Sequence, residues 1–195
     1  MAFLVVLTTA GVSPAAAQAD FYGRLGVTFA TKLLKDDILQ EIDVQQSLAP
    51  TLALGVSLPF TPQYSAGLEA AITSSGFHSS ENGSDTDLGT LRTGSLMLGL
   101  EGPLWQRVHW RAGAGLISYL PSEDSGIFLQ GGTTRFLVGA GLDYRYPVRS
   151  HWDLMASLRY DFHRFTTDEL VLRGFSGTQG VQRVSASIGL ARGHR

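Results

Sequence analysis

The chain of 195 residues contains no cysteine, which excludes disulfide bonds, thiolate metal sites and a cysteine nucleophile. Charged residues are scarce at 16%, and the formal net charge of -2 provides no basic field that would favour a nucleic-acid partner. No apolar run reaches the ~20 residues that a transmembrane helix requires. These absences leave a protein that, if it enters a membrane, does so without helices.

Familiar catalytic motifs are also missing: the sequence has no G-x-S-x-G, no P-loop and no G-x-G-x-x-G. The histidines do not share a metal-ligand spacing on one face, so we expect neither a metal site nor a cofactor. They are His78, His109, His151, His163 and His194.

The N-terminal residues have the character of an export signal. Ala2 to Val12 is short and mostly apolar, and Ala17-Gln18-Ala19 fits an A-x-A cleavage site. We therefore expect residues 1–19 to be a signal peptide and residues 20–195 to form one barrel domain that begins near Asp20.

A period of two residues dominates the remaining chain. In the stretch 135–146, apolar residues at even positions such as Phe136 and Leu142 alternate with Gly, Asp and Arg at odd positions. Such alternation predicts a strand with unlike faces. The same pattern predicts eight strands, most of them longer than the usual ~5–6 residues. They lie near 21–34, 47–60, 64–78, 88–101, 108–120, 134–146, 152–165 and 181–192.

The connections between these segments alternate in length. Segments 61–63, 102–107 and 147–151 are short, whereas 35–46, 79–87, 121–133 and 166–180 are longer and more polar. This rhythm indicates an all-β, eight-stranded antiparallel up-and-down transmembrane β-barrel. An even number of strands places both chain ends at the short turns, in the periplasm, and the long loops outside.

Aromatic residues cluster near the short turns, Phe21 and Tyr22 among them, and a second group near the long loops includes Tyr119 and Phe165. Two such girdles are typical of the two membrane interfaces. A lipocalin-like barrel or a β-sandwich remains the soluble alternative, but it would cover its surface with Gly, Ser and Ala. The predicted girdle comprises Phe60, Tyr64, Trp105, Trp110, Tyr144, Tyr146 and Trp152.

If the apolar face meets lipid, the charged residues point inward. An eight-stranded barrel is just wide enough for side chains to fill, so these charges should pair and plug the lumen. A gated ion path or a catalytic site is the alternative. The expected lumen charge network is Arg24, Lys32, Glu69, Glu101, Arg111, Asp143, Arg145, Asp153, Arg159 and Asp161.

On these features the sequence from 20 to 192 resembles the small eight-stranded outer-membrane barrels: the OmpA-like transmembrane domain and its OmpX- and NspA-like relatives. The resemblance implies a location in the outer membrane of a Gram-negative-type bacterium, among lipopolysaccharide and other outer-membrane lipids. It also implies a structural role or contact with an extracellular partner through the long loops. The oligomeric state stays open, with a monomer favoured. The ending "SASIGLARGHR" lacks the family's usual terminal aromatic residue.

Two other functions stay open. Lipid A deacylases of this barrel class use a His-x-Ser pair, and His78 with Ser80 gives that spacing near the end of the third predicted strand. A small pore for solutes or hydrophobic molecules, like the OmpW-type barrels, is the second; an apolar lumen would be its signature.

Overall fold

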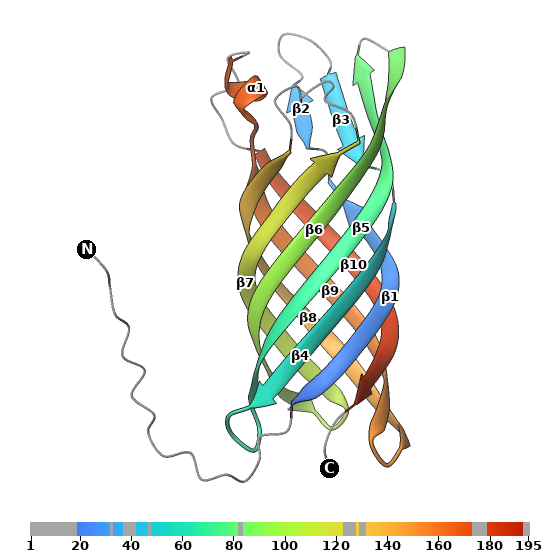
Figure 1. Ribbon diagram of the computed structural model, residues 1–195, viewed down its shortest axis with the longest axis vertical. Coiled ribbons are helices and arrows are strands. Elements are labelled where there is room, and N and C mark those ends of the chain that lie inside the picture. Colours follow the sequence, from blue (N-terminus) through green and yellow to red (C-terminus); the bar gives the residue numbers. More distant parts are fainter. Residues whose placement is uncertain are drawn as a thin grey trace, which may run out of the picture.

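The computed structural model describes residues 19–31, 33–36, 42–46, 48–81, 84–122, 128, 132–172 and 179–192. Within them, eight strands pair in sequence order into a closed antiparallel barrel (Figure 1). The barrel closes where β10 pairs with β1, from Phe21 opposite Arg192 to Ala30 opposite Arg183. Its strands are β1 (Asp20–Ala30), β4 (Ala49–Pro59), β5 (Ser65–Glu81), β6 (Ser84–Trp105), β7 (Val108–Pro121), β8 (Thr133–Arg149), β9 (Trp152–Phe165) and β10 (Gln179–Arg192).

This architecture confirms the predicted eight-stranded barrel, and each barrel strand overlaps its predicted segment. The first residue of β1 and the last residue of β10 lie beside the short turns, at the bottom of Figure 1. We call this the turn end of the barrel and the opposite end the loop end. No helix among the described residues has the length and apolar composition needed to cross a membrane.

The predicted long loops contain more structure than their polar sequences suggested. Segment 35–46 carries most of a small hairpin of β2 (Leu34–Asp36) and β3 (Ile42–Gln46), and segment 166–180 includes the short helix α1 (Asp168–Leu172). The prediction of a loop at 79–87 was wrong, because β5 and β6 continue pairing to Glu81 and Ser84. Beyond the membrane both faces of a strand can meet water, so no apolar alternation marks such an extension.

The alternation of residues places the large apolar side chains on the outer surface of the barrel, as expected for a protein in a bilayer. Large apolar residues on every barrel strand point outward and stay exposed, among them Leu25, Leu98 and Ile188 at 64–68%. Every backbone group that faces hydrocarbon must find a partner within the protein, and a closed barrel provides one. The apolar exterior therefore identifies a barrel that spans a membrane.

Glycines on the inner face let the barrel strands come together around long side chains. Gly67, Gly99, Gly113 and Gly139 stand opposite one another across β5, β6, β7 and β8. A Cβ atom at Gly139 would lie 1.9 Å from Oδ1 of Asp161. The row thus provides the space that the charged residues of the lumen occupy.

In the part of the chain that the structure describes, the strand pairing of the barrel wall is interrupted between β4 and β5. The β4–β5 ladder ends where Thr51 faces Thr73, and β3 joins β5 only at Phe77. Among the described residues, Ser74, Ser75 and Gly76 therefore pair with β6 but with no strand on their other side. Pro50 stands beside this break and carries no N–H group.

Cysteine labelling tests which end of the barrel faces outward. The native chain has no cysteine, so Thr86→Cys at the loop end and Gln106→Cys at the turn end each introduce a single thiol at an exposed position. A membrane-impermeant maleimide should label Thr86→Cys in intact cells and Gln106→Cys only after permeabilisation. The reverse pattern would invert the topology.

Candidate functional site in the barrel lumen

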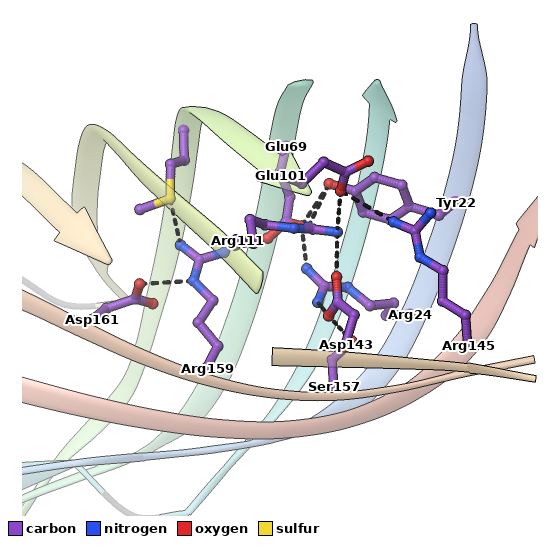
Figure 2. A network of polar contacts seen from close by, with 11 residues as sticks. Tyr22, Arg24, Glu69, Glu101, Arg111, Asp143, Arg145, Ser157, Arg159 and Asp161 are labelled. Carbon is purple, nitrogen blue, oxygen red and sulfur yellow. Dashed lines mark hydrogen bonds and ion pairs between the residues drawn. The ribbon is translucent and has the colours of Figure 1, made fainter. Parts of the chain in front are cut away.

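Glu69 on β5 is the centre of an ion-pair network that crosses the lumen (Figure 2). Its carboxylate accepts hydrogen bonds from the guanidinium groups of Arg24 on β1, Arg111 on β7 and Arg159 on β9. The hydroxyl of Tyr22 donates a further bond to Glu69 Oε2 at 2.8 Å. A single carboxylate thus connects four strands around the barrel.

Arg111 extends the network toward the opposite wall. Its Nη2 lies 2.7 Å from Oδ2 of Asp143 and 3.2 Å from Oε2 of Glu101. Arg145 Nη2 also contacts Glu101 Oε2, at 3.1 Å. Ser157 donates a hydrogen bond of 2.5 Å to Asp143 Oδ1. Charge-assisted bonds of this kind are stronger than neutral ones and fix the positions of their members.

The remaining arginine of the network bridges to a fourth carboxylate. Arg159 Nε lies 2.7 Å from Asp161 Oδ1, and its Nη2 lies 3.1 Å from the sulfur of Met97. Four arginines thus meet four carboxylates, so the charges balance. The members, which we call the lumen network, are Tyr22, Arg24, Glu69, Glu101, Arg111, Asp143, Arg145, Ser157, Arg159 and Asp161.

Eight of the charged residues expected in the lumen therefore come together. Lys32 lies outside the described residues. Asp153 is part-buried near the turn end of β9, where it stands opposite Pro147 and Ala191. Tyr22, which the sequence placed among the aromatics near the short turns, instead points inward and is buried. Its inward parity, shared with Arg24, was the signal for this position.

A belt of hydroxyl groups lies next to the lumen network. Thr28 is 2.6 Å from Thr51 and 2.7 Å from Ser185, measured between hydroxyl oxygens. Thr73 and Thr93 form a similar pair at 2.6 Å, and buried Arg183 donates to Thr93 at 3.2 Å. Arg183 was absent from the expected lumen charges, although it lies on the inward parity of its strand.

At the loop end the interior becomes apolar, which the sequence analysis did not predict. The rings of Tyr119 and Phe165 meet edge to face with centroids 5.1 Å apart, and Tyr119 also bonds His163 Nε2 at 2.6 Å. Tyr119 and Phe165 were expected in an outer aromatic girdle, but both are completely buried. The loop-end cluster comprises Leu33, Leu91, Met97, Ile117, Tyr119, Phe128, Leu137, Phe165, Leu170 and Val181.

The described side chains leave little free space in the lumen. Two cavities there measure about 30 and 20 Å³, whereas one water molecule needs roughly 10–15 Å³. A larger polar vestibule of about 370 Å³ at the turn end reaches Glu101 and Arg145, which are paired with each other. The lumen therefore has room for isolated waters and contains no continuous channel among these cavities.

The expected aromatic girdle lies at the turn end of the barrel. Six of its members are exposed, from Tyr64 at 41% to Trp105 at 73%. The seventh, Trp110, is half-buried, and its ring centroid is 6.3 Å from that of Tyr64. Amphipathic rings in this position suit the boundary between hydrocarbon and water.

The possible catalytic pair lies in the extension of β5. The backbone register places His78 opposite Asp87 and Ser80 opposite Asp85 of β6. The side chains of His78 and Ser80 lie outside the described part of the structure, so the two residues are located by their backbone pairing alone. Among the side chains that the structure describes, no His, Asp and Glu residues form a metal-binding group.

No protein-family model matches the sequence, and neither does any curated protein. Solved outer-membrane proteins do match the structure. The outer membrane protein AlkL has 14% identity and a TM-score of 0.56, covering 98% of this chain and 96% of its own. Neisserial surface protein A has 13% identity and a TM-score of 0.52, covering 88% of this chain and 96% of its own.

OprG from Pseudomonas aeruginosa is similar at 14% identity and a TM-score of 0.51, over 91% of this chain and 97% of its own. At such identities the likeness concerns the fold. The chain has the fold of the small eight-stranded outer-membrane β-barrels. The resemblance read from the sequence is thereby confirmed.

The lumen network predicts a graded loss of stability on neutralising its carboxylates. Glu69→Gln should lower the free energy of unfolding by ~3–5 kcal/mol, because buried Arg24 and part-buried Arg111 and Arg159 lose the negative charge of their common partner. Glu101→Gln should cost less, since Arg111 keeps its contacts with Glu69 and Asp143. Urea titration of the folded barrel in lipid vesicles measures both.

Asp87→Asn is the matched control, since Asp87 is exposed and its Oδ1 accepts a hydrogen bond from the backbone N–H of Gly89, which the asparagine oxygen can also accept. We expect a change within about 0.5 kcal/mol for this variant. Equal losses for Glu69→Gln and Asp87→Asn would show that the lumen network does not hold the barrel together.

Proposed function

We propose that the protein is an outer-membrane barrel of a Gram-negative-type bacterium that is closed to ions and serves a structural or surface-contact role. The observation that supports this best is the double obstruction of the lumen. Ions entering from the turn end meet the lumen network, and those from the loop end meet the loop-end cluster. Among the described residues, the cavities that reach into the lumen measure about 30 and 20 Å³, which is too little space for a polar path of ionic width.

The loop end provides the surface for contact with other molecules. The β5–β6 hairpin, the β2–β3 hairpin and α1 stand above the barrel in Figure 1. Residues Gln46 to Ile42 of β3 pair with Phe77 to Glu81 of β5, so these hairpins form one continuous sheet. A sheet anchored on a rigid barrel presents its surface in a fixed orientation. Such a surface is better suited to binding another molecule than to merely covering the end of the barrel.

Planar-bilayer recording tests the closed lumen. The folded wild-type barrel should insert without producing a steady, ion-sized conductance, because eight strands leave little lumen and the lumen charges are paired. Insertion is verified separately by the heat-sensitive electrophoretic mobility of the recovered protein. A stable, ohmic open level would contradict the proposal and favour a small pore.

A second candidate function is lateral passage of small apolar molecules, favoured by the break in the wall between β4 and β5. Thr51, Thr73 and Thr93 line both the 30 Å³ lumen cavity and an outer groove of about 630 Å³. Ser75 lies at the break with a buried hydroxyl that has no hydrogen-bond partner among the described residues. A molecule that displaced part of the loop-end cluster would thus find an exit toward lipid.

A pair of serine variants tests this route. Ser75→Leu should slow uptake of a small fluorescent hydrocarbon by cells expressing the protein, because the larger side chain fills the break. Ser57→Leu is the control, since Ser57 is equally inward and buried but belongs to the turn half of β4. Uptake that is unchanged in folded Ser75→Leu, or reduced equally in both variants, would remove lateral passage as a candidate.

A further inference from the structure

An arginine lies on the outer, lipid-facing surface near the loop end of β6. Arg92 has the outward parity of Leu96, Leu98 and Leu100 on the same strand, and it is exposed. Its neighbours on the adjacent strands are Ser74 of β5 and Leu120 of β7. Among the described residues Arg92 has no ion-pair partner, unlike the arginines of the lumen network.

The surroundings of Arg92 mark the boundary of the apolar exterior. Ser118 and Thr134 point outward on β7 and β8, and their hydroxyl oxygens are 2.8 Å apart. On β8, Thr134 and girdle residue Tyr144 are 10 positions apart (144 minus 134). At a rise of ~3.4 Å per residue and a tilt of about 40°, this corresponds to ~26 Å, close to the height of the apolar band of such barrels. Arg92 therefore lies at the level of the lipid headgroups.

A groove runs from Arg92 into the apolar band. Gly94 points outward with no atom within 4 Å of the place where its Cβ would be. It stands opposite Ile72, which is opposite Leu52, which is opposite Leu25. These residues, with Arg92 and Ser74, line the outer groove of about 630 Å³. The surface thus combines a cation and a hydroxyl at one end with an apolar trough leading away from them.

We propose that this groove binds lipid A, the phosphate-bearing and acylated part of lipopolysaccharide. The Arg92 guanidinium is suited to a bidentate contact with the phosphate, and the hydroxyls of Ser74, Ser118 and Thr134 are suited to the sugar. An acyl chain fills the trough over Gly94 along Ile72, Leu52 and Leu25. The charge on Arg92 then has a counter-ion at the depth where the headgroup lies.

The site deepens the proposed function, because it rests on the outer-membrane location. It gives the barrel a bound lipid at a specific place rather than a general lipid contact. Phosphatidylglycerol is the competing anionic lipid, but its single glycerol-linked phosphodiester offers a smaller charge than the phosphomonoester of lipid A. Lipid A is therefore the occupant to which charge and position correspond best.

Binding of fluorescent lipid A to the full chain in phosphatidylcholine nanodiscs tests the site. The wild type should bind lipid A more tightly than dephosphorylated lipid A. Arg92→Gln should weaken binding of lipid A about tenfold and abolish the preference for phosphate, since one charge-assisted contact is lost. Gly94→Leu should weaken both lipids while keeping the preference, because it fills the trough and leaves Arg92 in place.

Arg164→Gln is the matched control: Arg164 is exposed on β9, near the loop end, and does not line the groove. It should bind lipid A as the wild type does, and heat-sensitive mobility verifies that all variants fold. Unchanged affinity in Arg92→Gln, equal loss in Arg164→Gln, or equal binding of phosphatidylglycerol would each overturn the proposal. None of these results depends on ion conductance, so the proposal of a closed lumen is tested independently by the planar-bilayer recording.

Discussion

The constraint on which this structure depends is that hydrocarbon offers no hydrogen-bond partner to a backbone. Each N–H and C=O group at membrane depth must be paired within the chain, and strands achieve this only when the sheet has no edge. The return of β10 to β1 provides the closure. Once the sheet is closed, each side chain of a barrel strand faces either the lipid outside or the lumen inside. The alternation of residues along the strand decides which of the two it faces.

The narrow lumen then determines the chemistry of its contents. Charges that cannot reach bulk water are stable only with partners, and the lumen network combines four arginines with four carboxylates. Glu69 is effective because it receives donors from β1, β7 and β9, so that a single carboxylate opposes displacement of several strands. The contacts of the lumen network thus have two results: they fill space in the lumen that water would otherwise occupy, and they fix the positions of the strands.

The exterior departs from uniformity where β4 begins, at Ala49 and Pro50. Among the described residues, Ser74–Gly76 pair with a strand on one side only, because the β4–β5 ladder stops next to Pro50, and the outer groove begins at this place. Arg92 and Gly94 lie on the next strand, so the break, the groove and the Arg92 guanidinium share one face of the barrel. Lateral passage and lipid A binding make different demands on this face: the first needs the break open to the lumen, and the second needs only the outer surface.

The sequence by itself determined the number of barrel strands, their order and the face of most of their residues. Period-two alternation is a local property of a strand, so Glu69, Arg111 and Asp143 could be placed inside before any partner was known. Their partners could not, because the contact of Glu69 with Arg24 and Arg159 depends on register and stagger around the closed sheet. The loop-end cluster also needed tertiary structure: Leu33, Phe128 and Leu170 come from connections, and no period indicates that a connection folds into the lumen. Likewise, parity placed Arg92 on the outer face, but only the assembled strands brought it beside Ser74, Gly94 and the groove.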